Sequence, residues 1–232
     1  MTWGRLGAPV VTTWGQAGDG PIPSGHIPSY ERPKPRPEPV DRKYFARLSS
    51  VRPMPASATP AQSEHPYRIT VVCLGNICRS PMGEAVLRDR IEAAGLSDRV
   101  VVDSAGTGTW NLGNPADSRA RAALAQHGYG SATDHRARQI TPNWFAEIDL
   151  VLAMDEANYA DLDRLIARSG IDPELRMMRS FDPALGHLEQ PHPDLDVPDP
   201  YYGGSDGFAA VLDMIERAAD GVVRHVGAHL SA

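Results

Sequence analysis

The distribution of apolar residues divides the chain into two unlike parts near residue 66. Residues 1–66 contain 12 of the 21 prolines and show neither helical nor strand periodicity. From Tyr67 onward, short apolar runs alternate with stretches whose apolar residues recur at helical spacing. The pattern predicts a disordered, proline-rich extension over 1–66 and a folded domain over 67–232.

The folded part alternates predicted strands with predicted helices. Strands are expected at 67–72, 100–102, 148–153 and 175–178, and helices from Ser80 onward and at 119–127, 155–168 and 207–230. Such alternation indicates βαβ units, so we expect an α/β three-layer sandwich around a parallel sheet of about four strands. In sheets of this kind, functional loops lie at the carboxyl ends of the strands.

Composition restricts the classes of function. The net charge of −6 argues against general nucleic-acid binding. Residues 67–232 carry 15 Lys/Arg and 24 Asp/Glu, so an anion would need a local binding site rather than an attractive overall field. Two cysteines, Cys73 and Cys78, are too few for a disulfide-rich secreted scaffold.

No apolar run approaches the ~20 residues that a membrane span requires, and the N-terminus has no apolar signal-peptide core. We therefore expect a cytoplasmic protein without membrane contact, while export by a route that needs no signal peptide stays open.

The proline-rich extension leaves three interpretations open. Its segment 32–39 alternates proline with charged residues and predicts an extended, polyproline-like chain. It could be a docking tail for a proline-binding partner, or a disordered extension that buries too little apolar surface to fold. Alternatively, translation begins at Met54, shortly before the patterned region.

The loop after the first predicted strand is the most informative stretch. It runs directly from a strand into a helix, a shape that turns successive backbone N–H groups inward and forms an anion-binding nest. The positive end of the helix strengthens the same field. The stretch reads Cys73, Leu74, Gly75, Asn76, Ile77, Cys78, Arg79, Ser80, Pro81. We expect the backbone from Leu74 to Ser80 to bind a phosphate group.

The residue types in this loop suit phosphoryl transfer. A nest and a neighbouring arginine would stabilise the thiolate of Cys73, which could then attack phosphorus. Arg79 offers a planar pair of donors to the equatorial phosphate oxygens, and the Ser80 hydroxyl could stabilise Cys73 as a leaving group. The alternative is that Cys73 packs as a small buried hydrophobe.

This loop resembles the active-site loop of the low-molecular-weight protein-tyrosine phosphatases. The likeness extends, in order, through 103–107, 135–140, 154–156 and 199–203, and it covers about residues 67–230. The resemblance implies hydrolysis of phosphotyrosine in tyrosine-phosphorylated proteins, without a metal or an organic cofactor.

The resemblance also assigns roles outside the loop. Asp199 would be the general acid, in a segment stiffened by Pro198 and Pro200. Ser104 and His135 would support the loop from beneath, together with Asn76. The plain interpretation of Asp155 is a helix cap.

Three aromatic residues, Trp110, Tyr201 and Tyr202, are expected to form walls that favour an aryl phosphate, although packing in the core is the alternative for each. The resemblance suggests a reversible Cys73–Cys78 disulfide, against the alternative of a packed Cys78 thiol. His225 and His229 have a zinc-compatible spacing, but no third ligand is evident and we expect no metal site.

Three rival functions compete with phosphotyrosine hydrolysis. Phosphoarginine phosphatases of the family carry a smaller polar residue where Ile77 stands, which favours the aryl substrate. An arsenate reductase of similar fold needs further cysteines downstream, and none follows Cys78. A non-catalytic phosphopeptide-binding module would not need a nucleophile, a clamp and an acid together.

Overall fold

The computed structural model describes residues 65–130 and 132–231. Four strands are present in these ranges: β1 (Tyr67–Cys73), β2 (Val100–Gly106), β3 (Leu150–Ala153) and β4 (Glu174–Met177). The helices are α2 (Arg79–Ala93), α3 (Ser118–Gln126), α4 (Glu156–Ser169) and α5 (Ser205–His229), with short 3₁₀ turns η1 (Pro142–Glu147), η2 (Met178–Phe181) and η3 (Pro193–Leu195). The predicted tail, its proline-binding partner and the Met54 start lie outside the described residues, and the domain boundary at 66/67 stays a prediction.

All strand pairs are parallel, in the order β2-β1-β3-β4. β1 pairs with β2 on one side and with β3 on the other. The chain adds β2 on one side of β1 and then crosses back to add β3 and β4 on the other side, so the strand order reverses between β1 and β3. Ligand sites of open α/β sheets lie at the carboxyl ends of the strands beside such a switch point. The loop that follows Cys73 occupies this position.

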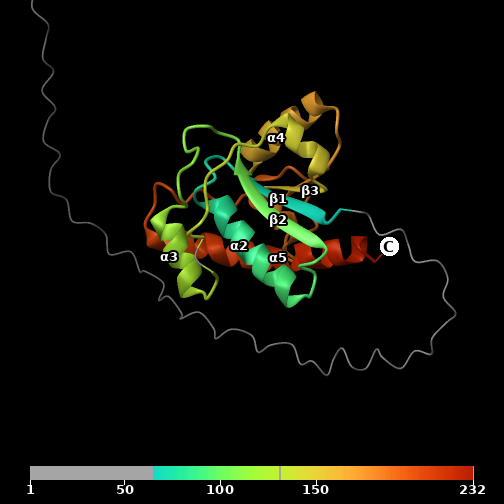
Figure 1. The fold of residues 1–232 in the computed structure, drawn as a ribbon. Helices are drawn as coiled ribbons and strands as arrows, with labels where there is room; N and C mark the ends of the chain where they lie inside the picture. The colour runs from blue at the N-terminus through green and yellow to red at the C-terminus, as the bar shows by residue number, and fades with distance from the viewer. Residues whose placement is uncertain (1–64, 131, 232) are drawn as a thin grey trace, which may run out of the picture. The chain divides into compact units, whose positions relative to one another are not determined.

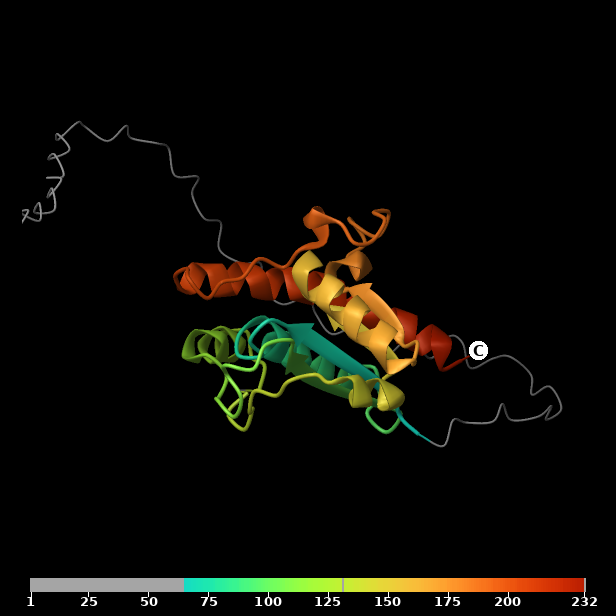
Figure 2. The ribbon, with the colours of Figure 1, turned by 90° about the horizontal axis from the view of Figure 1, so that it is seen from above.

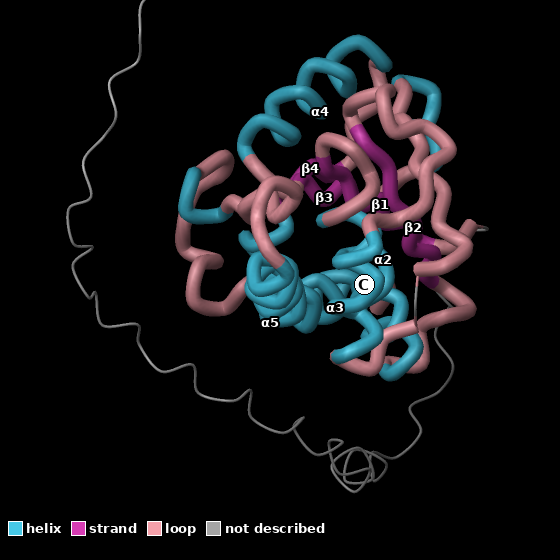
Figure 3. Tube along the Cα trace, turned by 90° about the vertical axis from the view of Figure 1, so that its left-hand side faces the viewer, coloured by secondary structure: helices cyan, strands magenta, loops and turns pink. Residues whose placement is uncertain are grey.

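The sheet is covered on both faces. Figures 1 and 3 show α4 on one side of the strands and α2, α3 and α5 on the other. Strand alternation explains the two cores: Ile69 and Val71 of β1 pack with α2 and α5, whereas Val72 packs with α4 and η1. The predicted three-layer α/β sandwich with a four-stranded parallel sheet is confirmed.

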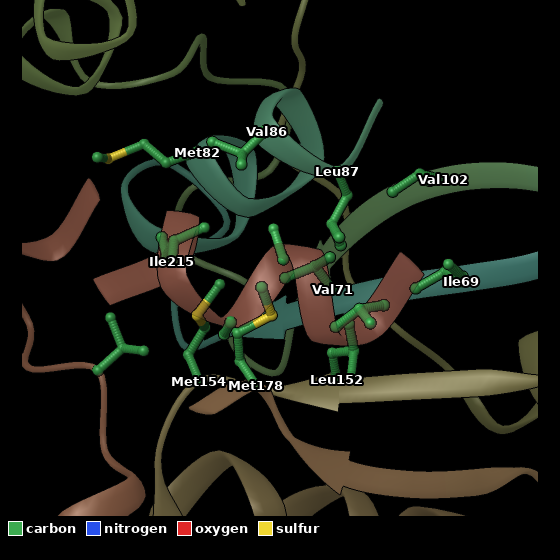
Figure 4. Packing of buried hydrophobic residues seen from close by; sticks show 14 of the residues in the cluster. Ile69, Val71, Met82, Val86, Leu87, Val102, Leu152, Met154, Met178 and Ile215 are labelled. Carbon is green, nitrogen blue, oxygen red and sulfur yellow. The ribbon is translucent and has the colours of Figure 1, made fainter. Parts of the chain in front are cut away.

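The larger core lies between the sheet and the helix pair α2–α5. Its centre is formed by fully buried aliphatic and methionine side chains from β1, β3, α2 and α5, labelled in Figure 4: Ile69, Val71, Leu152, Met82, Val86, Leu87 and Ile215. The length of α5 is apparent in Figure 2, and this helix contacts α2, α3 and η2. Burial of its apolar side therefore connects distant parts of the domain.

Close packing of α5 against η2 depends on Gly221. A Cβ atom at this position would overlap the carbonyl oxygen of Phe181 and lie 2.9 Å from its carbonyl carbon. Gly227, on the same helix, has no atom within 4 Å of such a Cβ.

We expect Gly221→Ala to lower the free energy of unfolding by about 1–3 kcal/mol, because the clash is with backbone that cannot rotate away. Gly227→Ala is the matched control and should raise the same free energy by up to ~1 kcal/mol, because alanine is the better helix former. Urea denaturation of both variants measures the difference. Equal effects would contradict the close approach.

Candidate active site

The loop between β1 and α2 owes its shape to Asn76. Asn76 is fully buried and has φ of 53°, in the left-handed region that non-glycine residues rarely adopt. Its side-chain amide donates to Ser80 Oγ and to Ser104 Oγ, both at 2.9 Å, and its Oδ1 accepts the Arg138 N–H at 2.8 Å. Three hydrogen bonds thus hold a conformation that would otherwise be strained.

A second set of residues holds the same loop from outside. His135 Nε2 lies 2.7 Å from the Asn76 carbonyl oxygen, so this nitrogen carries the proton. Ser104 donates to Glu84 Oε2 at 2.6 Å, and the Arg138 guanidinium donates to the Ser104 carbonyl. Burial, the largest influence, lowers the pKa of His135, while the Asn76 carbonyl and Glu84 oppose that shift.

The end of β2 approaches the loop closely. A Cβ on Gly106 would lie 2.8 Å from the Leu74 carbonyl oxygen and 3.1 Å from the Asn76 nitrogen. Thr107 N–H donates to the Cys73 carbonyl at 3.0 Å. Only a residue without a side chain fits this approach, which fixes the loop against β2.

The Cys73 thiol lies at the base of the loop and is 2% exposed. Its Sγ is 3.0 Å from Ser80 Oγ, and it accepts the Asn76 backbone N–H at 3.3 Å. The Asn76 amide hydrogen and the Ser80 hydroxyl group are thus the polar neighbours of the sulfur. Ser80 is itself held by Asn76, so the groups around the sulfur belong to one network.

Arg79 is buried and is bound by three acceptors. One terminal nitrogen donates to Asp155 Oδ2 and, at 3.0 Å, to the Val197 carbonyl, and the other donates to Asp199 Oδ2 at 3.1 Å. Burial lowers the pKa of Arg79, but the Cys73 sulfur and the two carboxylates outweigh it, so the net shift is upward. These contacts use three of the five N–H donors of the guanidinium, and the other two have no acceptor among residues 65–130 and 132–231.

The predicted acid and aromatic residues line one cleft with Cys73 and Arg79. This cleft has a volume of about 320 Å³ and is lined by Cys73, Leu74, Gly75, Ile77, Cys78, Arg79, Trp110, Asn111, Asp199, Tyr201 and Tyr202. The Tyr201 and Tyr202 rings meet edge to face, with centroids 5.1 Å apart. Trp110 is 67% and Tyr202 94% exposed, so neither packs in the core.

Cys78 borders the same cleft as a free, buried thiol. Burial, reinforced by nearby Asp117, raises the pKa of Cys78 to about 12. Cys73 is also a free thiol in this structure, so the suggested Cys73–Cys78 disulfide stays a prediction.

Several residues of the site were not predicted from the sequence. Asp155 caps α4 as expected, accepting the Asn158 N–H at 2.7 Å, but its second oxygen also binds Arg79. Its position at the carboxyl end of β3 was the available signal. The roles of Glu84 and the Arg138 guanidinium could not be predicted from the sequence, because they follow from their contacts with Ser104 in the folded structure.

A larger hollow, of about 600 Å³, lies behind the loop rather than at Cys73. It borders Glu84, His135 and Arg138, and its charged side chains are of mixed sign. Although this hollow is the larger of the two, no cysteine, serine or threonine lines it, so we do not assign it as the active site.

The described residues contain neither a cluster of metal ligands nor a helix that could cross a membrane. No three His, Cys, Asp or Glu side chains of residues 65–130 and 132–231 gather as a metal site. His225 instead pairs with Glu174 at 2.8 Å, and the His229 ring packs on Tyr67. No helix of these residues is long and apolar enough to cross a bilayer.

Fold and cleft together define an α/β protein whose strand–loop–helix turn brings a cysteine, an arginine and a distant aspartate into one cleft. The family model described as low molecular weight phosphotyrosine protein phosphatase matches residues 68–232. The chain belongs to this family, which confirms the family predicted from the sequence.

Individual relatives agree with that assignment. A low molecular weight protein-tyrosine-phosphatase of Streptomyces coelicolor is 51% identical over 160 residues, covering 69% of this chain and 93% of the relative. The structure of a protein tyrosine phosphatase from Entamoeba histolytica matches with a TM-score of 0.61 and 33% identity, over 70% of this chain and 98% of the other. A Drosophila arginine phosphatase matches with a TM-score of 0.60 and 32% identity, over 69% and 97%.

The raised pKa of Cys78 predicts a difference in thiol reactivity. An acid whose pKa is raised to about 12 keeps its proton below that pH, and the neutral thiol is a poor nucleophile. We expect the Cys73→Ser variant to resist iodoacetamide at pH 7–9, whereas the native protein takes one label, at Cys73. Peptide mass spectrometry locates the label, and rapid modification of Cys78 at pH 7 would contradict the prediction.

Proposed function

We propose that the protein hydrolyses phosphotyrosine in proteins through a cysteinyl-phosphate intermediate. The observation that carries the proposal is the convergence on the Cys73 sulfur: it accepts the Asn76 N–H and lies 3.0 Å from Ser80 Oγ. Arg79 and Asp199 line the same cleft. Nucleophile, phosphate clamp and proton donor are therefore within reach of one bound phosphate.

The first step transfers the phosphoryl group to the enzyme. The Cys73 thiolate attacks phosphorus, and a sulfur–phosphorus bond forms as the bond to the tyrosine oxygen breaks. Asp199 gives its proton to that oxygen, so tyrosine leaves as a neutral phenol. The two free N–H donors of Arg79 and the loop amides from Leu74 to Ser80 bind the equatorial oxygens, where charge accumulates.

The second step releases phosphate. The Asp199 carboxylate takes a proton from water as the water oxygen attacks phosphorus, and the sulfur–phosphorus bond breaks. The Ser80 hydroxyl, 3.0 Å from the sulfur, stabilises the departing thiolate. Inorganic phosphate leaves, and Asp199 is protonated again for the next cycle.

The walls of the cleft favour an aryl phosphate. Trp110, Tyr201 and Tyr202 offer ring faces and edges to the substrate ring, and Ile77 adds an apolar contact at the loop. A phosphoarginine guanidinium would bring N–H donors against these apolar groups, and unpaired donors are costly when desolvated. Because a similar structure is that of an arginine phosphatase, membership of the fold does not by itself decide the substrate.

Arsenate reduction and non-catalytic phosphopeptide binding have less support than hydrolysis. Arsenate reduction would need a relay of cysteines, and the sequence has none after Cys78. A phosphopeptide-binding module would have no use for a carboxylate beside the clamp, yet Asp199 Oδ2 accepts from Arg79 at 3.1 Å.

Two substitutions test the mechanism. Cys73→Ser should abolish hydrolysis of p-nitrophenyl phosphate. Asp199→Ala should lower kcat for a phosphotyrosine peptide by ~10²–10⁴-fold with a modest change in KM, because the acid acts mainly in the transition state. Asp194→Ala is the matched control, since this exposed aspartate precedes the acid in the same segment, and its kcat should not change. An undiminished kcat in Asp199→Ala would remove Asp199 from its role.

Substrate choice is tested by kcat/KM for matched phosphotyrosine and phosphoarginine peptides. The native protein should prefer phosphotyrosine, and Trp110→Ala should narrow that preference because it removes ring stacking, worth ~0.5–1.5 kcal/mol per contact. A native preference for phosphoarginine would overturn the choice of substrate while leaving the cysteine mechanism standing.

A further inference from the structure

Arg119, in the first turn of α3, connects two loops that are far apart in the sequence. Its Nε and one terminal nitrogen donate to the two oxygens of Asp117, at 3.0 and 2.9 Å. The other terminal nitrogen donates to the carbonyl oxygen of Gly203 at 2.9 Å. The guanidinium is therefore oriented by Asp117 and bound to the turn that follows Asp199.

Asp117 is itself attached to the phosphate-binding loop. Its backbone N–H donates to the Ile77 carbonyl at 2.7 Å, and its side chain caps α3 by accepting the Arg119 N–H at 2.8 Å. The hydrogen bonds from Arg119 lower the pKa of Asp117, which therefore stays ionised as an acceptor. A continuous path of hydrogen bonds thus joins the loop of the nucleophile to the turn of the acid.

Two aromatic rings contact the Arg119 guanidinium. The guanidinium carbon lies 4.6 Å from the ring centroid of Phe208, in the first turn of α5, and 5.7 Å from that of Tyr201. Phe208 is fully buried in the core, so it gives Arg119 a fixed base.

The segment from Asp199 to Gly203 is consequently held at both ends. At its start, Asp199 Oδ2 accepts from Arg79, and Oδ1 accepts the Tyr201 N–H at 3.1 Å. At its end, the Gly203 carbonyl accepts from Arg119, while the Gly203 N–H closes a turn on the Pro200 carbonyl. When a phosphate competes with Asp199 for Arg79, the hydrogen bond from Arg119 to Gly203 still holds this turn against α3.

We propose that Arg119 is a positioning residue for proton transfer: through Gly203 and Tyr201 it holds the Asp199 carboxyl where the leaving oxygen will be. The proposal rests on Asp199 being the general acid. Arg119 lines no part of the cleft and does not touch the reacting atoms. Displacements of about 1 Å at catalytic groups can lower the rate by ~10²-fold. Loss of the Arg119–Gly203 hydrogen bond should therefore slow the proton transfer from Asp199 more than the other steps.

The test uses a series of aryl phosphates whose leaving phenols differ in acidity. General acid catalysis matters most for a strongly basic leaving oxygen and least for p-nitrophenolate. Arg119→Met should therefore lower kcat/KM for phenyl phosphate by about tenfold, within the ~10²–10⁴-fold contribution of an acid, and much less for p-nitrophenyl phosphate. The expected result is a steeper dependence of log kcat/KM on the basicity of the leaving group.

A merely structural role would lower kcat/KM for all substrates by one factor, giving parallel lines, and that result overturns the proposal. Arg119→Lys keeps the charge but lacks the planar fork, so its slope should lie between those of Arg119→Met and the native protein. Complete rescue by lysine would show that charge alone suffices and would also overturn the proposal. Arg164→Met, which removes an exposed arginine paired with Asp161, is the matched control and should leave the slope unchanged.

Asp199→Ala separates this inference from the function on which it rests. If Asp199→Ala does not steepen the slope, the assignment of the acid fails. If Asp199→Ala steepens the slope and Arg119→Met does not, only the role of Arg119 fails. In the double variant, Arg119→Met should add no further steepening, because the carboxyl that it positions is gone. Should Arg119→Met not fold, Phe208→Leu, which removes the ring beneath Arg119, is read out in the same series.

Discussion

The left-handed backbone of Asn76 is the constraint on which the site depends. That conformation directs the Asn76 N–H at the Cys73 sulfur, and a residue with a side chain adopts it only where its surroundings compensate. Compensation comes from Ser80, Ser104 and the backbone of Arg138, through three hydrogen bonds to one buried amide. Since these partners come from α2, β2 and the segment after α3, the loop takes its shape only in the complete fold.

The network also explains how a strongly acidic domain would bind a phosphate group, as the proposed function requires. Residues 67–232 carry more Asp and Glu than Lys and Arg, and two carboxylates, Asp155 and Asp199, lie against the arginine of the site. These carboxylates raise the pKa of Arg79 and orient its guanidinium, so they preserve the charge of the clamp despite its burial. Local geometry, with amide hydrogens and one oriented cation at a helix N-terminus, takes the place of an attractive overall field.

Prediction from the sequence succeeded where a pattern is local. β1 and α5 have long, regular apolar patterns and were found within a few residues, whereas η1 and η3 are too short to show a period. The loop at Cys73 is contiguous in sequence and was recognisable as a unit. Glu84 could not be found in this way, because its role follows from the β1–β2 register, in which Val71 pairs with Ser104. The same holds for Arg119, whose partner Gly203 is 84 residues away.

The candidate site is assembled from one contiguous segment and one distant segment. The nucleophile and its nest follow from one strand–loop–helix unit, but Asp199 belongs to the segment that leads into α5. Its position depends on α5 being packed, since Phe208 in the first turn of that helix is buried and supports the acid turn through Arg119. In the proposed mechanism, phosphate binding and proton donation thus rest on different parts of the fold. In that mechanism, a change confined to the contact of Phe208 with Arg119 would weaken proton donation, whereas the hydrogen bonds of the Asn76 side chain come from α2, β2 and the segment after α3.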